Sequence, residues 1–172
     1  GTRCVDQSSH HDHCGGCGIT CGSGQVCRDS KCTSSKSHLW LTEYRLLPAP
    51  GVEIQNPTNQ TIDVKNYRIE VGANPFTLPS RKLKPGEFLW ISAGDGTNTD
   101  SVVFARQKIP ASAFTYTQHV SLLDDTRTAI DFVKFGDSTE QAPSGTSWFG
   151  DPADAPGGSD ESARRNTHVQ DT

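Results

Sequence analysis

Apolar and polar residues alternate along most of the chain after Leu39. Leu39 and Leu41 alternate with Trp40, Thr42 and Tyr44, which is the period of a strand that turns one face toward a core. The same alternation, or a short apolar run, recurs along the chain. It predicts strands within residues 39–47, 52–56, 61–71, 87–93, 101–105, 119–124 and 129–136.

Turn residues separate these runs. Asn56-Pro57-Thr58-Asn59 and Lys84-Pro85-Gly86-Glu87 have the chemistry of tight turns, and the shift at Lys65-Asn66 indicates a bulge or bend. No segment shows an apolar stripe with the helical period. Seven to nine short strands with regular turns predict an all-β fold, a β-sandwich of the immunoglobulin type.

The first 32 residues follow a different pattern, because glycine, serine and aspartate dominate and large apolar side chains are nearly absent. Such a segment is too short and too polar to fold by burial, so it needs disulfides, a metal ion or a partner. An even number of cysteines in loop-rich spacing favours three disulfides and leaves their pairing open. The cysteines are Cys4, Cys14, Cys17, Cys21, Cys27 and Cys32.

The cysteines could instead form a zinc site or a redox pair. Zinc could be held by Cys14 and Cys17 with Cys21 or His13, but a second, well-separated cysteine pair is missing. A redox pair at Cys14 and Cys17 would normally begin a helix, whereas here it lies in a glycine-rich stretch. The neighbouring His10, His11 and His13 form either a candidate metal cluster or a solvated run.

The shift in composition divides the chain into two regions. Residues 1–37 are expected to be the disulfide-stapled segment and a linker, and residues 38–172 the sandwich with a Pro-, Gly- and Asp-rich C-terminal segment. The net charge of −4 gives no basic excess for nucleic-acid binding, and no apolar run is long enough to cross a membrane. Methionine is absent, which we read as a sign of a processed, exported chain.

The sequence contains none of the common catalytic motifs. A phosphate-binding loop, Gly-x-Ser-x-Gly, His-Glu-x-x-His and a dinucleotide-binding glycine motif are all missing. Glu43 and Glu53 are expected to point outward or to pair with Arg45 and Lys65, and nothing places a cleft between them. We therefore expect no enzyme and no catalytic residues.

Two weaker candidate sites remain. Asp95, Asn98 and Asp100 in the loop 94–101 offer oxygen ligands for calcium, although the glycine and glutamate of an EF-hand are absent. We expect no cofactor, with calcium at this loop as the single alternative. Clustered exposed aromatic side chains would mark a binding surface, and the candidates for it are Phe114, Tyr116, Trp148 and Phe149.

Residues 4–32, "CVDQSSHHDHCGGCGITCGSGQVCRDSKC", resemble the short cysteine-rich units of surface and secreted proteins from myxobacteria and related bacteria. The resemblance rests on the Cys-Gly-x-Cys-Gly-x-x-Cys spacing and the cysteines that follow it. It implies a small disulfide-held module in an oxidising export compartment and carries no activity.

Residues 38–136 are similar to the lamin tail domain, an immunoglobulin-like sandwich found in bacterial exported proteins and in nuclear lamins. The segments "LTEYRLLPAPGVEIQNPTNQTIDVKNYRI", "FTLPSRKLKPGEFLWIS" and "SLLDDTRTAIDFVKFG" carry the similarity. Tyr67 stands where many members have tryptophan, and the loop from Gly94 to Gln118 is long. "SARRN" resembles the closing segment of the domain, which implies that Arg164 or Arg165 packs near the sandwich edge. The matching residues are Glu43, Glu53, Asn56, Pro57, Asp63, Leu78, Pro79, Leu83, Pro85, Gly86, Asp131, Val133 and Gly136.

Together these features predict a secreted or cell-surface, non-enzymatic binding or structural module for adhesion, scaffolding or extracellular assembly. The expected partner is a protein or a second copy of the chain, joined through an open sandwich edge or the cysteine-rich arm. The first alternative is an accessory domain of an extracellular enzyme that binds polysaccharide or DNA. The second is a calcium- or zinc-dependent binding protein. The fold alone does not decide among them.

Overall fold

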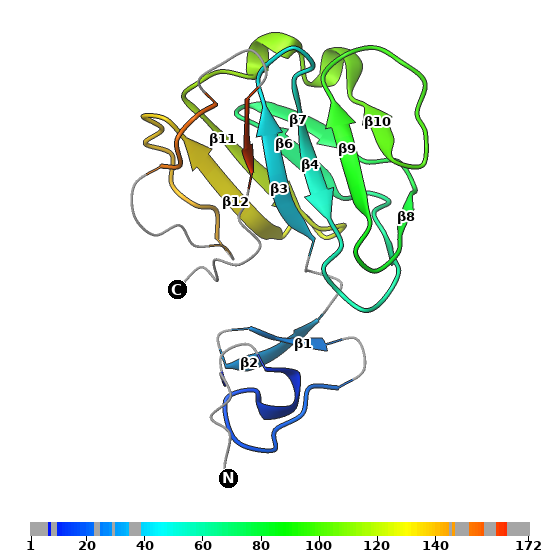
Figure 1. Cartoon of the computed structure of the whole chain (residues 1–172), viewed down its shortest axis with the longest axis vertical. Helices are drawn as coiled ribbons and strands as arrows, with labels where there is room; N and C mark the ends of the chain where they lie inside the picture. Colours follow the sequence, from blue (N-terminus) through cyan, green and yellow to red (C-terminus); the bar gives the residue numbers. More distant parts are fainter. Residues whose placement is uncertain are drawn as a thin grey trace.

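A computed structural model describes residues 7, 10–22, 25–28, 30–34, 39–144, 146, 152–156 and 161–164. Residues 39–135, together with residues 162–164, build two main sheets (Figure 1). The larger sheet has the strand order β10 (Val102–Phe104), β9 (Phe88–Ser92), β4 (Gly51–Gln55), β3 (Trp40–Arg45) and β13 (Ser162–Arg164). β10 runs parallel to β9, and the other pairs are antiparallel.

The second sheet is antiparallel throughout, with the order β12 (Ala129–Phe135), β11 (Gln118–Leu123), β6 (Arg68–Val71) and β7 (Asn74–Thr77). Two small pairs complete the strands: β5 (Ile62–Asp63) with β8 (Lys82–Leu83), and β1 (Gln25–Arg28) with β2 (Lys31–Ser34). The described helices are single 3-10 turns, namely η1 (His11–His13), η3 (Arg106–Lys108) and η4 (Ala111–Ala113).

The predicted all-β sandwich is confirmed, and so is the disulfide-held N-terminal region. Side chains from both main sheets form one apolar core. Leu41, Val52 and Ile54 come from the larger sheet, while Ile69 and Leu122 face them from the smaller one, and each is at most 4% exposed. Each predicted run contains an observed strand, but the sequence patterns missed β7, β8, β13 and the hairpin of β1 and β2.

A β-bulge in β3 corrects one sequence-based expectation. Leu41 pairs with Ile54 and Glu43 with Glu53, so Thr42 is an extra residue against β4. The alternation therefore switches after Leu41, and Tyr44, which simple alternation groups with Trp40, lies in the core at 2% exposure.

A buried carboxylate joins the two sheets beside this bulge. Asp131 Oδ2 on β12 accepts the backbone N–H of Leu41 at 2.7 Å, and Asp131 Oδ1 accepts the backbone N–H of Phe132 at 2.9 Å. Asp131 pairs directly with the core residue Leu122 on β11. Paired residues project to the same side of a sheet, so the carboxylate projects inward. The contact meets a backbone donor that the irregular strand would otherwise bury without a partner.

The phenol of Tyr44 fixes the long connection between β10 and β11. Its ring stacks between Phe114, at a centroid distance of 5.5 Å, and Phe135, at 4.5 Å. The Tyr44 hydroxyl donates to Thr115 O at 3.0 Å and accepts from Thr115 N at 3.1 Å. Burial raises the pKa of this phenol, although the bond to Thr115 opposes the shift.

The predicted turn after β4 is organised by Asn56, whose side chain is fully buried. Asn56 Nδ2 donates to the carbonyls of Gln60, at 2.7 Å, and Leu83, at 2.8 Å. Asn56 Oδ1 accepts from Thr58 N and Thr58 Oγ1. One amide therefore satisfies four polar groups and ties the turn to β8.

Replacing Asn56 with alanine should destabilise the sandwich by about 3 kcal/mol, because the part-buried carbonyl of Gln60 and the buried carbonyl of Leu83 lose their shared donor. The measurement is urea unfolding, with the midpoint falling at an unchanged slope. The exposed neighbour Asn59 gives the matched control, Asn59→Ala, which should leave the midpoint in place. Equal shifts in the two variants would contradict this role for Asn56.

Stability should also fall at alkaline pH. Burial, together with the carboxylates of Asp125 and Asp124, raises the pKa of Tyr67 to about 12. The unfolded phenol ionises near pH 10, so between about pH 10 and 12 the unfolded state holds fewer protons, and stability declines as pH rises. Urea midpoints measured across this range should decline less steeply for Tyr67→Phe than for the parent chain, and equal slopes would argue against the effect.

Candidate functional site

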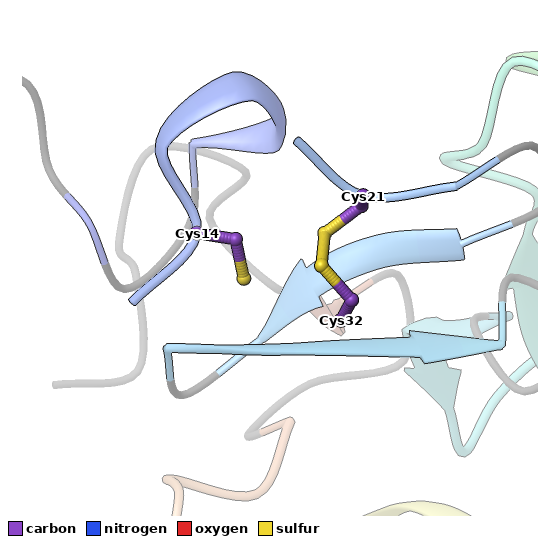
Figure 2. Close-up of side chains that lie close together, drawn as sticks. All are labelled: Cys14, Cys21 and Cys32. Carbon is purple, nitrogen blue, oxygen red and sulfur yellow. A yellow bond between two sulfur atoms is a disulfide. The ribbon is translucent and has the colours of Figure 1, made fainter. Parts of the chain in front are cut away.

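Two disulfides hold the N-terminal module. Cys14 is bonded to Cys27 and Cys21 to Cys32, with Cα–Cα distances of 5.3 and 5.2 Å. Cys27 and Cys32 are direct partners in the hairpin of β1 and β2, so both bridges tie the preceding loop to the same place. Figure 2 shows the sulfur of Cys14 beside the Cys21–Cys32 bond, and the three sulfurs lie within 4.8 Å of one another.

The third predicted disulfide stays a prediction. Cys17 is exposed and has no disulfide partner among the described residues, and Cys4 lies outside them. The alternative zinc set needed Cys14 and Cys17 with Cys21 or His13. In this oxidised form, Cys14 and Cys21 are bridged and do not offer the thiolates that zinc binds. The same bridge at Cys14 disagrees with a redox pair formed by Cys14 and Cys17.

Within the predicted histidine cluster, His10 and His13 have described side chains, and both accept hydrogen bonds from the local backbone. His10 Nδ1 accepts the N–H of Asp12 at 3.1 Å, and His13 Nδ1 accepts the N–H of Gly18 at 2.9 Å. Their rings lie 5.0 Å apart, but across the described part of the chain only the three cysteines form a group of metal-ligating type. The side chain of His11 lies outside the described residues. His10 and His13 do not form a metal-ligating group with any other described residue.

The candidate calcium loop has a structural task at the edge of β10. Asn98 Oδ1 accepts the N–H of Phe104 at 2.9 Å, and Thr99 Oγ1 accepts the N–H of Val102 at 3.1 Å. The Asn98 oxygen is thus used by the backbone. Asp95 and Asp100 are exposed, and they do not belong to any metal-type cluster of the residues that the structure describes.

The predicted aromatic binding surface is wrong at Phe114, which is 8% exposed and stacks on Tyr44 in the core. Of the other candidates, Tyr116 is exposed at 57%, while Trp148 and Phe149 lie outside the described residues. Phe114 is buried because the Tyr44 hydroxyl holds the adjacent Thr115 backbone against the sandwich.

A different aromatic surface lies on the outer face of the larger sheet. Trp40, Gln55 and Phe88 form one row across β3, β4 and β9, because the strand register pairs them directly. Phe88 is 45% exposed, and Trp40 and Gln55 are half-buried. Trp90 projects from the same face two residues farther along β9. We call the set Trp40, Gln55, Phe88 and Trp90 the outer-face surface.

The sequence of β9 contains a signal for this surface, because the strand is apolar on both faces. Phe88 and Trp90 alternate along β9 with Leu89 and Ile91, whose side chains are buried at 0% and 1% exposure. A strand that is apolar at every position has two apolar faces, of which the core covers one. The predicted strand 87–93 was correct, but its second apolar face was not recognised.

A chain of charged and aromatic contacts crosses the same face toward β13. The side chain of Glu43 is only 4% exposed. Its carboxylate binds Arg45 Nη2 at 2.7 Å and Arg164 Nη2 at 3.0 Å. The Arg45 guanidinium lies over the Trp90 ring, 4.8 Å from its centroid. The expected pairing of Glu43 with Arg45 is confirmed, and Arg164 packs at the sandwich edge as the family resemblance implied.

The remaining acidic candidate, Glu53, also has a structural partner. Thr42 Oγ1 donates to Glu53 Oε1 at 2.9 Å, so the extra residue of the bulge meets the strand opposite. Glu43 and Glu53 are neighbours across β3 and β4, yet Glu43 is held by two arginines and Glu53 by a hydroxyl. This arrangement assigns both carboxylates to holding the sheet together.

No protein-family model matches the chain, and a search of curated proteins found no match. Among the described residues, no helix is both long and apolar enough to span a membrane.

Gly51 determines where the Trp90 ring lies, and Gly51→Ala tests this. An added Cβ would meet Trp90 Cζ2 and would lie 2.6 Å from the carbonyl oxygen of Ile91, so the indole must lift from the sheet. We expect a loss of about 1–3 kcal/mol and a red shift of tryptophan fluorescence. In the control Gly94→Ala, the nearest atom is Ser92 Oγ at 3.5 Å, and an equal effect there would contradict the assignment.

Proposed function

We propose that this chain is a secreted or cell-surface, non-enzymatic module of the lamin-tail type that assembles with further copies of itself through the outer-face surface. The single observation that carries the proposal is the row of Trp40, Gln55 and Phe88, which holds two aromatic side chains, is partly exposed and lies on the outer face of the larger sheet. The sandwich supplies rigidity, and the disulfide module supplies an arm that resists unfolding outside the cell.

The two disulfides support an oxidising location. Disulfides persist in secreted and surface proteins and are rare where thiol buffers keep cysteines reduced. The polar and glycine-rich sequence around them would have little else to hold it folded. The module therefore fits a chain that works outside the reducing cytoplasm.

The composition of the outer-face surface supports a protein partner. Tryptophan and arginine are enriched among the residues that dominate protein interfaces, where flat aromatic surfaces are buried and charged groups sit at the rim. Trp90 lies under Arg45, which leaves Phe88 as the most exposed aromatic side chain of the set. The net charge of −4 disfavours nucleic acid as the partner.

The alternative of an accessory polysaccharide-binding domain shares this surface. In the row of Trp40, Gln55 and Phe88, two aromatic side chains flank an amide. The aromatic rings can stack on a sugar ring, and the amide can hydrogen-bond to the hydroxyl groups of the sugar. We favour assembly because Arg45 covers Trp90, so that ring does not offer an open stacking face. Polysaccharide binding is the contrasting outcome of the test.

Phe88→Ser should weaken self-association about tenfold, because an interface residue of this kind contributes about 1.4 kcal/mol or more. Sedimentation velocity over a concentration series of the oxidised chain measures this. The matched control is Tyr116→Ser, which removes an even more exposed aromatic side chain elsewhere, at 57% against 45% for Phe88, and should change nothing.

The same proteins would be pelleted with purified cellulose and chitin. Binding to either polymer that is lost in Phe88→Ser, by a chain that stays monomeric throughout the concentration series, would replace assembly with the polysaccharide alternative. A monomeric chain that binds neither polymer would overturn the proposed function.

A further inference from the structure

Three of the four outer strands of the two main sheets are protected against pairing with another chain. At β10, the outward N–H groups of Val102 and Phe104 are taken by Thr99 and Asn98. At β7, Pro75 is exposed and has no N–H to donate. These edges are closed by groups that belong to the sandwich itself.

The third protected strand is β12. The carbonyl of Lys134 accepts the N–H of Ala153 at 2.9 Å, the carbonyl of Ala153 accepts the N–H of Gly136 at 2.9 Å, and Phe135 and Ala153 form a parallel bridge. The N–H of Phe132 is accepted by Asp131 Oδ1. The segment around Ala153 therefore covers this edge and is anchored on it.

The fourth outer strand is β13, which covers the edge of β3 with only three residues. Ser162 pairs with Arg45, Ala163 with Tyr44 and Arg164 with Glu43. Three paired residues make few backbone hydrogen bonds, and Arg164 itself is 69% exposed. β13 therefore has a ladder of only three residues, as short as that of β10, and it lacks the side-chain contacts from Thr99 and Asn98 that protect the β10 edge.

The β3 edge is nevertheless selective for the sequence that occupies it. Ala163 packs against the core, where its small side chain fits beside Tyr44. Glu43 is 4% exposed, and a buried carboxylate that loses one of its two cations is costly. A replacement strand must therefore present a small residue followed by a cation, as Ala163 and Arg164 do.

We propose that the β3 edge is a strand-exchange site, at which Ser162–Arg164 of a second copy of this chain replaces the resident β13. A second copy carries the selected sequence by definition, and exchange of an identical element forms every contact that the single chain forms. Ser162 follows the anchored Ala153 by nine residues, a span that reaches up to about 30 Å when extended. This inference rests on the proposed assembly role and names the contact that would link the copies.

A disulfide trap tests the exchange. Arg45 and Ser162 are direct partners on adjacent strands, a spacing that suits a disulfide. In a Cys4→Ser/Cys17→Ser background, one chain carries Arg45→Cys and the other Ser162→Cys. The two are mixed at low and high concentration, equilibrated and oxidised with a small aromatic disulfide. We expect a covalent heterodimer whose yield rises with protein concentration.

Three controls make the result decisive. The double variant Arg45→Cys/Ser162→Cys should close within one chain at low concentration, which verifies the register. Adding Arg164→Glu to the Ser162→Cys partner should abolish the heterodimer, because two carboxylates would then meet at Glu43. Pairing Arg45→Cys with Thr61→Cys, at an exposed site outside the strands, gives the background from random collision.

A heterodimer yield no higher than this background, with the double variant closing normally, would overturn strand exchange. Failure of the double variant to close would overturn it as well, because β13 would then not pair as described. The variant Phe88→Ser tests the outer-face proposal separately. If association depends on Phe88 but no heterodimer is trapped, only the strand-exchange proposal is overturned. If a heterodimer is trapped but Phe88→Ser has no effect on association, only the proposed outer-face contact is overturned.

Discussion

The hydrogen bond from the Leu41 backbone to Asp131 is the contact on which the arrangement of the larger sheet depends. It joins β3 to β12 at the point where β3 carries one residue more than its neighbour. A bulge in a buried strand leaves backbone groups out of register, and the carboxylate supplies the acceptor that the ladder does not. The irregularity is thereby kept at one position along the strand.

The position of that bulge decides what each face of the sheet presents. Beyond it, Tyr44 turns inward and orders the connection around Thr115, while Glu43 and Arg45 turn outward. The outward pair then connects β13 on one side, through Arg164, with Trp90 on the other. The core and the outer surface thus have a common origin in a single extra residue.

Much of the fold could be predicted because alternation reports burial directly. The runs around Val52 and Ile54, and around Val120 and Leu122, have one core face and were correctly identified as strands. The face assignment of Tyr44 could not be predicted, since a bulge changes the period without changing the composition. β7 escaped notice because the run Asn74–Thr77 contains Pro75, which is typical of a turn unless the strand is known to be at an edge.

The candidate site was harder to predict because it depends on neighbours distant in the sequence. The row of Trp40, Gln55 and Phe88 exists only once the register of three strands is fixed. Phe114 has the same chemical character as Phe88, yet it is buried because Tyr44 stacks on it from β3. Polar loop residues mislead for the opposite reason: the oxygens of Asn98 and Thr99, which could serve an ion, are consumed by nearby backbone N–H groups.

The order of the cysteines has a mechanical consequence. The bridges overlap along the chain, from Cys14 to Cys27 and from Cys21 to Cys32. A pulling force that enters at Cys14 and leaves at Cys32 passes through the first bridge and then along only the short hairpin between Cys27 and Cys32. A second covalent route runs from Cys14 along the chain to Cys21 and through the other bridge to Cys32, so the distance between Cys14 and Cys32 stays short under tension even if the hydrogen bonds of the module break. A protein tethered through this module would transmit a pulling force to the sandwich with little extension of the region between Cys14 and Cys32.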